Sequence, residues 1–375
     1  MAVIKLKSEI KNDNYTEYVY NAFDIQDRNL TEVEVSFSLG EAKSFDWNIG
    51  VIYGGSGSGK TTILKQMGEV AVSDLSPDKA LISNFDWLTP EDAAMLLTSM
   101  GLSSVPTWLR PFHLLSNGEQ YRADLAYKVA KANSGDVILI DEYTSVVDRD
   151  VAKSMSFSLQ KYIRKTNKRI ILASCHYDIM EWLMPDWTCS PQKGGALERG
   201  DWLRQGRPKV ELQVSRVEYS AWNIFKKHHY LTENANKSCM FFLFQWGGKP
   251  VGIVACSRLP SGTVKNAYRL NRTVVLPDFQ GMGIGSKISE FVCSILKGRV
   301  FTKTVNPALG EYRSKSDNWK ATSKNGKVLK GQKRELSENI WSTKTRPSYC
   351  YEYVGEVNSG FDDITKPIKD MRSVK

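Results

Sequence analysis

The chain has 375 residues, 41% of them hydrophobic and 25% charged, with a formal net charge of +10. This length suits two domains, each large enough to bury its own apolar core. The composition is typical of a soluble globular protein. The longest apolar runs, such as CMFFLFQW, fall far short of the roughly 20 residues that cross a bilayer. We therefore expect no membrane span and no membrane partner.

The N-terminal residues and the cysteines both favour a cytoplasmic protein. The start, MAVIKLKSEIKND, has no long apolar stretch and no small-residue cleavage site, so secretion is not expected. The six cysteines form no CxxC pair and show no paired spacing, which argues against a zinc ribbon or a disulfide framework. We expect free thiols, most of them buried.

The first motif along the chain is a phosphate-binding loop. WNIGVIYG predicts a buried strand, TTILKQMGEV predicts a helix, and GGSGSGKTT at residues 54–62 lies between them, as this motif requires. Its glycines let backbone N–H groups point at nucleotide phosphates, Lys60 would neutralise the β- and γ-phosphate oxygens, and the Thr61 hydroxyl would ligate Mg²⁺. The residues expected at ATP are Gly54, Gly57, Gly59, Lys60, Thr61 and Thr62.

The next predicted elements are a helix and two strands. LLSNGEQYRADLAYKVAKA predicts a long amphipathic helix, and DVILIDEYTS predicts a strand that ends in Asp141 and Glu142 at the carboxyl edge of a parallel sheet. Asp141 fits the water shell of the metal, and Glu142 fits the base that orients the attacking water; a solvated loop start is the structural alternative. RIILASCH predicts a third strand, which delivers His176 to the same edge. There His176 would sense the γ-phosphate, although a lone histidine is more often structural.

Four short runs together resemble the ABC ATPases. LSNGEQ is similar to their LSGGQ signature, LIDE to their Walker B motif, SVVDR with Asp148 to their D-loop, and His176 to their H-loop histidine. The resemblance covers about 140 residues and implies a head-to-tail homodimer. Ser116 and Gly118 of one protomer would close on the γ-phosphate that Lys60 of the other holds, so that ATP acts as a dimer clamp.

Two departures from the ABC pattern point away from transport. Only 54 residues separate Thr61 from Ser116, which leaves little room for the helical subdomain that grips a membrane partner. The expected Q-loop glutamine is absent from ALISNFDWLTP, where Asn84 or Asp86 would have to substitute. Phe23 is the candidate for stacking on adenine.

A second domain is expected after a boundary rich in glycine, proline and charge. CSPQKGGALERGDWLRQGRPK predicts a linker or a short hairpin, so we place the two domains at residues 1–195 and 205–375. Beyond it, CMFFLFQWGGKPVGIVACSRL predicts two strands joined by a turn, and AYRLNRTVVLPDF predicts a further strand. A glycine-rich loop, a helix (SKISEFVCSILKG) and a strand (RVFTKTVNP) follow.

This order of elements resembles the coenzyme A site of GNAT acetyltransferases. The loop resembles their Q/R-x-x-G-x-G/A pattern, and backbone amides at the start of a helix would bind the pyrophosphate of acetyl-CoA or another acyl-CoA. The expected cofactor-binding residues are Gln280, Gly281, Met282, Gly283, Ile284, Gly285 and Ser286. A dinucleotide-binding domain is the alternative, but it needs an acidic residue about 20 positions on, and the chain there is basic and polar.

A narrower resemblance links this domain to the GNAT branch of the phage Mom DNA-modification protein. FKKHHYLTENANKS, RLNRTVVLPDFQGMGIG, TVNPAL, SKSDNWK and SYCYEYVG carry it. It implies transfer of a group from a coenzyme A thioester to an adenine amino group in DNA. His228, His229 and Tyr230 would then be catalytic, as proton acceptors, proton donors or metal ligands. The alternative is a helix end whose histidines cap carbonyls.

Positive charge gathers near the C-terminal end. Between Lys297 and Arg346 there are thirteen Lys and Arg residues against four Asp and Glu, which suits a polyanion such as DNA, with RNA as the alternative. A solvated basic face without a partner is the structural alternative. The interleaved aromatics Trp319, Trp341, Tyr349 and Tyr351 would stack on a base or belong to the core.

The sequence therefore predicts an α/β protein with an N-terminal ABC-type P-loop ATPase domain and a C-terminal GNAT-like α+β domain with a mixed sheet. Its expected function is ATP-hydrolysing, coenzyme A-dependent acyl transfer to a nucleic-acid base. Two other functions stay open. One is a non-catalytic, ATP-dependent DNA clamp or defence-related binding protein, and the other is an N-acetyltransferase for a protein or small-molecule amine.

Overall fold

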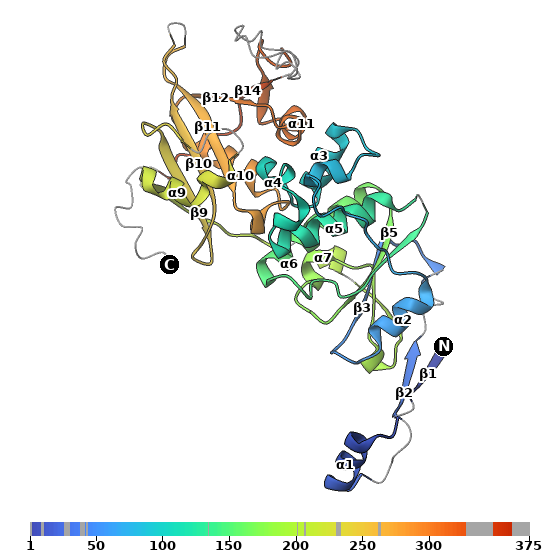
Figure 1. Ribbon diagram of the computed structural model, residues 1–375. Helices are drawn as coiled ribbons and strands as arrows, with labels where there is room; N and C mark the ends of the chain where they lie inside the picture. The colour runs from blue at the N-terminus through green and yellow to red at the C-terminus, as the bar shows by residue number, and fades with distance from the viewer. Residues whose placement is uncertain are drawn as a thin grey trace, which may run out of the picture. The chain divides into compact units, whose positions relative to one another are not determined.

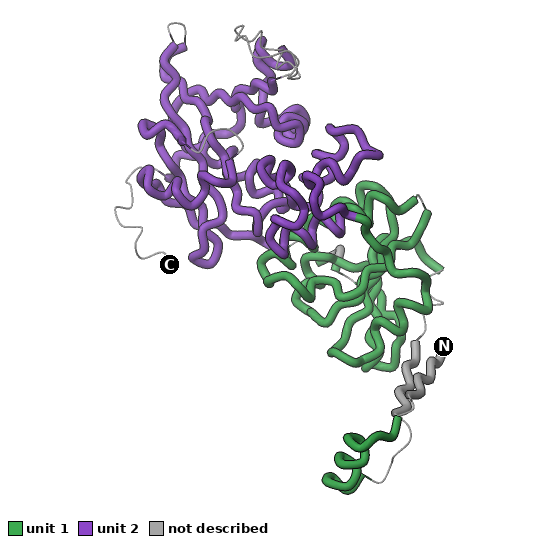
Figure 2. The backbone as a smooth tube through the Cα atoms, in the orientation of Figure 1, with its two compact units in different colours: residues 1–74, 127–208 green, residues 75–126, 209–375 purple. Residues whose placement is uncertain are grey.

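The computed structural model describes residues 2–8, 11–25, 31–37, 42, 44–133, 135–200, 202–205, 208–229, 234–261, 264–327 and 348–361. The chain forms two compact units (Figure 2). The first comprises residues 1–74 and 127–208, and the second comprises residues 75–126 and 209–375. This grouping differs from the two contiguous domains that we expected, because residues 75–126, here called the signature segment, belong with the C-terminal residues.

The first unit is built on a five-stranded sheet in the order β4-β5-β3-β6-β7. The strands β3 (Ile49–Tyr53), β4 (Val137–Ile140), β5 (Arg169–Ser174) and β6 (Trp187–Cys189) are parallel, and β7 (Leu197–Arg199) pairs antiparallel with β6. β3 is buried along its whole length, as expected for a central parallel strand covered on both faces. The predicted boundary segment thus contributes the β6–β7 hairpin, one of its two expected forms.

The first unit also contains helices, most of which are labelled in Figure 1. They are α1 (Asn14–Ala22), α2 (Lys60–Met67), α6 (Arg149–Lys165), α7 (Met180–Leu183) and α8 (Trp202–Gln205). Ile63 and Leu64 of α2 pack with β3, β4, β5 and β6 in one apolar cluster, so that the helix after the phosphate loop is anchored on the sheet. The strands β1 (Ala2–Ser8) and β2 (Thr31–Phe37) form a separate antiparallel pair.

The signature segment is helical. It contains η2 (Leu81–Asn84), α3 (Pro90–Ser99), α4 (Val105–Trp108), η3 (Phe112–Leu114) and the start of α5 (Asn117–Lys131). The helix α5 continues into the first unit, so the chain passes from one unit to the other inside a regular helix.

The second unit contains a seven-stranded sheet in the order β13-β14-β12-β11-β10-β9-β8. Its strands are β8 (Gln213–Val217), β9 (Met240–Trp246), β10 (Lys249–Arg258), β11 (Ala267–Val275), β12 (Arg299–Thr304), β13 (Trp319–Ala321) and β14 (Tyr349–Tyr353). Neighbouring strands are antiparallel except β11 and β12, which are parallel. The sheet is therefore mixed, as predicted.

Helices cover both faces of this sheet (Figure 1). The helix α10 (Ile284–Ile295) packs its apolar side on one face, with Val254 and Cys256 of β10. The helix α9 (Trp222–Phe225) packs on the other face, with Ile253 and Ala255 of the same strand. Alternate residues of β10 thus point to opposite cores, as the period of two along a strand requires. The remaining helices are η5 (Tyr219–Ala221), η6 (Lys226–His228), η7 (Pro277–Phe279) and α11 (Pro307–Lys315).

The parallel strands β11 and β12 pair only along the first half of β11. Their register runs from Ala267 opposite Arg299 to Leu270 opposite Thr302, whereas β11 continues to Val275. At the same point the β10–β11 register shifts, since Ala255 pairs with Arg272 and Cys256 pairs with Leu270. The extra residue is Asn271, and a bulge of this kind bends a strand and increases its twist. The bulge accounts for the separation of the two strands.

Several general expectations can now be compared with the structure. The two sheets with their helices confirm the α/β fold class. In the described residues no helix is long and apolar enough to cross a membrane. All six cysteines are free thiols, four of them buried. Burial raises the pKa of the Cys189 thiol to about 11 and that of Cys256 to about 12, so both stay protonated.

Candidate functional sites

The phosphate loop has the backbone conformation that the motif requires. Gly57 and Gly59 adopt φ values of 75° and 89°, and Gly59 is the residue before the first turn of α2. Lys60 Nζ donates to the carbonyl oxygens of Gly54 and Gly55 over 2.9 and 2.7 Å, so its ammonium lies over the loop. A positive charge and a helix N-terminus together favour the phosphates of a nucleotide. The residues therefore fit the predicted ATP.

The two predicted metal-site residues lie together. Thr61 Oγ1 donates to Asp141 Oδ1 over 3.2 Å, although one residue lies in the first turn of α2 and the other directly follows β4. A hydroxyl and a carboxylate are ligands that suit Mg²⁺ beside nucleotide phosphates. Among the described residues no group of three or more His, Cys, Asp or Glu side chains could hold a metal by itself. The pair therefore fits a metal that also needs phosphate oxygens and water.

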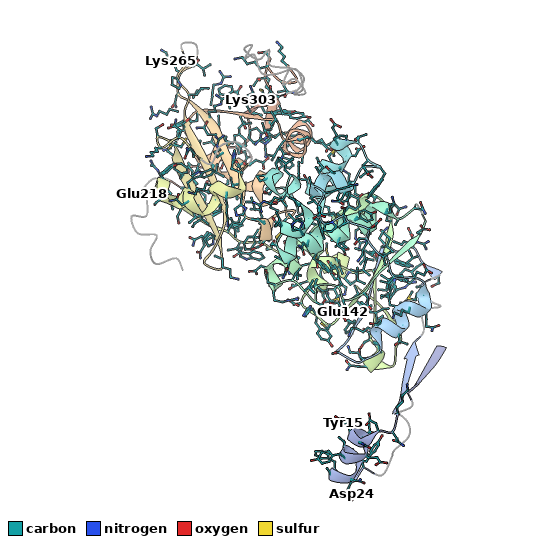
Figure 3. All side chains as sticks on the ribbon, viewed as in Figure 1. Tyr15, Asp24, Glu142, Glu218, Lys265 and Lys303 are labelled. Atoms are coloured by element: carbon teal, nitrogen blue, oxygen red, sulfur yellow. The ribbon has the colours of Figure 1, made fainter. Side chains whose placement is uncertain are left out.

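Glu142 follows this pair at the exposed edge of the first unit (Figure 3). Its backbone N–H donates to Asp141 Oδ1 over 2.9 Å, and its φ of 53° lies in the left-handed region. A non-glycine residue adopts this region at some cost in energy, and such residues cluster at functional sites. The conformation turns the chain sharply, directly after the strand, where the base for the attacking water is expected.

His176 is held by a residue that the sequence analysis missed. Its Nδ1 lies 2.9 Å from Thr144 Oγ1, and Thr144 is fully buried with a φ of 69°. Burial and the nearby Arg149 lower the pKa of His176, and Asp178 opposes them only in part. The histidine is therefore neutral at pH 7. The signal that could have indicated Thr144 is its place two residues after the acidic pair.

Asp148 and Ser116 both cap helices. Asp148 accepts hydrogen bonds from the N–H groups of Asp150 and Val151, each over 3.0 Å, at the start of α6. Ser116 and Glu119 bond each other reciprocally at the start of α5: Ser116 N donates to Glu119 Oε2 over 3.0 Å, and Glu119 N donates to Ser116 Oγ over 3.4 Å. This is a capping box. Their predicted contacts with ATP remain predictions.

Glu119 itself is buried, at 6% exposure. Burial would raise the pKa of its carboxyl, but the hydrogen bonds from Ser116 and Thr107 prevail and hold it below the ordinary value. Its charge therefore persists inside the protein at the N-terminus of α5, where the helix dipole favours a negative group. The motif around Ser116 and Gly118 is thus a rigid helix start.

The loop of residues 280–286, here called the glycine loop, has the geometry of an anion site. Gly281 and Gly283 have φ values of 85° and 79°, and Gly283 precedes α10. The first helical hydrogen bond runs from Lys287 N to Gly283 O, so the N–H groups of Ile284 to Ser286 have no partner inside the helix. A Cβ added to Gly283 would meet nothing within 4 Å. The space next to Gly283, beside these amides, is therefore open.

The side chains of this loop face the protein. Ile284 is buried in the core at 6% exposure, and Met282 packs against the same cluster. Gln280 is 8% exposed; its Oε1 accepts from Ser103 N over 2.7 Å, and its Nε2 donates to Val275 O over 2.8 Å. The backbone of the loop is therefore the part that can bind an anion, while the Gln280 side chain holds the loop in place.

The two predicted catalytic histidines have different environments. His229 is 8% exposed and packs against the Trp222 ring, with centroids 5.9 Å apart. Burial and the charge of Arg272 lower the pKa of His229 to about 4. His228 is half-buried, and burial and the charge of Lys227 lower its pKa below the ordinary value. Both are neutral at pH 7, and Tyr230 lies outside the described residues.

Only part of the predicted basic segment lies in the described residues, because 328–347 fall outside them. Within it, Arg299 forms a bidentate pair with Glu352, with bonds of 2.6 and 2.8 Å, and Arg313 is buried at 3% exposure. Trp319 and Tyr351 are 6% and 4% exposed and belong to the apolar core. These two aromatics are therefore core residues, and Trp341 lies outside the described residues.

A buried carboxylate on α10 is a second feature that sequence reasoning missed. Glu290 is 7% exposed, and its Oε1 accepts hydrogen bonds from Tyr312 Oη over 2.9 Å and from Trp319 Nε1 over 3.0 Å. These bonds join α10 to α11 and β13. In the sequence, the position of Glu290 on the apolar side of the predicted helix SKISEFVCSILKG could have indicated this burial. The cluster fixes the helix that carries the glycine loop.

Comparison with known protein families finds a match that begins in the first unit and lies mostly in the second. Residues 177–313 match the model of the acetyltransferase (GNAT) family. The match confirms a GNAT acetyltransferase domain in the C-terminal part of the chain and, with it, the prediction that the chain is an enzyme; the predicted bounds of 205–375 stay a prediction. No curated protein sequence matches the chain significantly.

Two solved structures are similar to different parts of the chain. cbiO1 from Clostridium perfringens, part of the ABC transporter complex cbiONQ, is 16% identical, with a TM-score of 0.33, over 53% of this chain and 89% of its own. The ribosomal-protein-S18-alanine N-acetyltransferase from Escherichia coli is 14% identical, with a TM-score of 0.27, over 40% of this chain and 98% of its own.

Proposed function

We propose that the protein is an ATP-dependent acyltransferase that moves an acyl group from acetyl-CoA, or another acyl-CoA, to an amino group of a nucleic-acid base. The observation that carries this proposal is the glycine loop. It begins a helix with free backbone amides inside the GNAT region, close in sequence to the end of β11. The ATP side rests on the phosphate loop and on the contact between Thr61 and Asp141.

Coenzyme A would lie between β11 and β12, where the two strands no longer pair. The amides of residues 281–286 would bind its pyrophosphate, because free N–H groups and the α10 dipole both favour an anion. Beyond Leu270, β11 no longer pairs with β12, so its edge offers backbone groups to the amides of the pantetheine arm. The bulge at Asn271 is what provides this edge.

The transfer needs one proton acceptor. The acceptor amine attacks the thioester carbonyl, a C–N bond forms, the C–S bond breaks, the amine loses a proton and the departing thiolate gains one. A base that is neutral at working pH is required. His228 meets this condition and is half-buried, whereas the pKa of about 4 makes His229 a weak base. We therefore favour His228 for proton transfer and His229 for packing beneath it.

ATP would be held and hydrolysed in the first unit. Lys60 would neutralise the phosphates, Thr61 and Asp141 would hold Mg²⁺ with them, and Glu142 would orient water. Ser116 and Gly118 of a second protomer would complete the site, which makes the protein an ATP-dependent homodimer. Closure of this dimer would clamp nucleic acid or present the acceptor base.

The nucleic-acid partner is supported by surface charge. Lys320 on β13 and Lys324 and Lys327 after it are exposed, and Lys303 lies on β12, one strand beyond β14 (Figure 3). Lysines grouped in this way suit phosphates. DNA is the proposed substrate because of the resemblance to the Mom branch, and RNA is the alternative.

Mass spectrometry of nucleosides from the DNA of cells that express the protein tests this function. We expect a base adduct whose added mass equals an acyl group, and we expect it to disappear with Gly283→Asp. Unmodified nucleosides together with acetylated peptide or small amines would support the N-acetyltransferase alternative. Unmodified nucleosides with intact DNA binding and no acetyl-CoA binding would support the clamp.

A further inference from the structure

The glycine loop and the η7 turn that leads into it are each tied to the signature segment by a hydrogen bond. Ser103 N donates to Gln280 Oε1 over 2.7 Å, and Arg122 Nη1 donates to the Pro277 carbonyl over 2.6 Å. Pro277 begins the short η7 turn that leads into Gln280. The entrance to the loop is therefore held by residues more than 150 positions earlier in the chain, all within the second unit.

Arg122 connects the loop to the signature motif itself. Its side chain is 1% exposed, and besides Pro277 it donates to the carbonyls of Gly118, from Nε over 3.1 Å, and Gly101, from Nη1 over 3.2 Å. Breaking a hydrogen bond of a buried guanidinium is unfavourable, because water cannot readily replace the lost acceptor. The three carbonyls are therefore constrained to move together, and one of them belongs to the motif expected at ATP.

We propose that Arg122 and Ser103 are positioning residues that couple the motif around Ser116 and Gly118 to the glycine loop, so that ATP-driven closure changes the affinity for acyl-CoA. This inference rests on the proposed function. When a phosphate engages Gly118, Arg122 transmits its displacement to Pro277, and Ser103 transmits any shift of the signature segment to Gln280. The pyrophosphate amides follow Gln280 directly.

Thermodynamic linkage makes the proposal quantitative. If ATP changes the acetyl-CoA dissociation constant by a given factor, acetyl-CoA must change that of ATP by the same factor. We expect a factor within about 5–150, the usual range for coupled sites. The experiment titrates the full chain carrying Glu142→Gln, which keeps ATP unhydrolysed, with acetyl-CoA in a calorimeter, with and without ATP and Mg²⁺.

Three variants separate coupling from folding. Arg122→Met removes all three carbonyl contacts, and the ATP effect on the acetyl-CoA Kd should fall below about twofold. Arg122→Lys keeps the charge, but an ammonium has no planar fork to span the carbonyls, so the effect should also fall. Thr98→Val is the control: it removes the 2.7 Å bond from Thr98 Oγ1 to the Ala94 carbonyl on α3, inside the signature segment but away from Arg122, Ser116 and the loop, and should keep the ATP effect.

Gln280→Met provides a second route if Arg122→Met fails to fold, since it removes the bond from Ser103. A full ATP effect in folded Arg122→Met and Gln280→Met would overturn the coupling. A parent that binds acetyl-CoA equally with and without ATP would also overturn it, while leaving the proposed function intact. A parent that binds no acetyl-CoA in either condition would overturn the proposed function and the coupling together.

Discussion

Thr61 Oγ1 lies 3.2 Å from Asp141 Oδ1, across 80 positions of the chain. The contact brings the helix after the phosphate loop to the carboxyl end of β4, where Glu142 follows immediately. Asp141 is engaged with Thr61 and with the Glu142 backbone N–H, whereas the Glu142 side chain is exposed. The proposed roles, Asp141 at the metal and Glu142 at the attacking water, agree with this difference.

Replacing Glu142 with Gln should slow ATP hydrolysis by roughly 10²–10⁴-fold, the usual contribution of a general base. The metal pair is untouched, so ATP should still bind and hold the dimer. Light scattering with ATP and Mg²⁺ measures the dimer. Lys60→Ala is the matched control, since it should lose ATP and remain monomeric. A Glu142→Gln protein that stays monomeric with ATP would contradict the clamp.

Replacing Gly283 with Asp should abolish acetyl-CoA binding and leave ATP hydrolysis intact. The new carboxylate would occupy the open space beside the amides and repel the pyrophosphate, and φ of 79° disfavours any side chain. Gly285 differs, because no positive φ is found there and a Cβ would contact Val275 at 3.5 Å. Gly281 and Gly283 are therefore the strained positions of the loop.

Gly326→Asp is the matched control for this variant. Gly326 has a φ of 72°, and a Cβ there would likewise meet nothing within 4 Å, but it lies in the turn after β13. Both variants should lose a similar amount of stability, and only Gly283→Asp should lose acetyl-CoA in calorimetry. Unchanged acetyl-CoA affinity in folded Gly283→Asp would rule the loop out as the pyrophosphate site.

Binding to duplex DNA should weaken steeply with salt. Each neutralised phosphate contributes a slope of about 0.9 in log K against log salt. Replacing Lys320, Lys324 and Lys327 together with Ala should lower the slope by up to about 2.7, the sum of three such contacts. The control removes three exposed lysines of the first unit, Lys65, Lys161 and Lys165. A slope near zero, or equal slopes for both variants, would argue against nucleic acid at this face.

The low pKa of His229 should make the free energy of unfolding fall in mild acid. Its pKa of about 4 lies below the ordinary value of 6.5, so between these pH values the unfolded chain binds a proton that the folded protein does not. The stabilisation is complete above about pH 6.5 and declines as pH falls toward 4. Thermal unfolding at pH 7.5 and pH 5.0 measures it.

His229→Gln removes this titration without adding charge. The drop in Tm between the two pH values should be smaller in this variant than in the parent. An equal drop in both proteins would show that His229 is accessible to protons in the folded state. In that case His229 would regain its place beside His228 as a candidate base.

Local signals were sufficient for much of the fold. The runs around β3, β4, β5, β9, β10, β11 and β12 show the alternation or continuous apolarity of strands, and the structure places strands there. The conformations of Gly57, Gly59 and Gly283 also follow from short motifs, since only a few residue types tolerate positive φ. Hydrophobic period and glycine placement act over a few residues, so the sequence alone determined these elements.

The tertiary structure decided how the segments group. Ser103 and Gln280 are 177 positions apart, and Arg122 and Pro277 are 155 apart, so no local pattern could place residues 75–126 with the GNAT region. The same holds for burial. His229 was a candidate catalytic residue and Trp319 and Tyr351 were candidates for stacking on a base, but all three side chains lie in the interior. A polar side chain acquires its pKa and its partners only when distant segments pack around it. The sequence by itself therefore determined the motifs, and folding determined which of them act together.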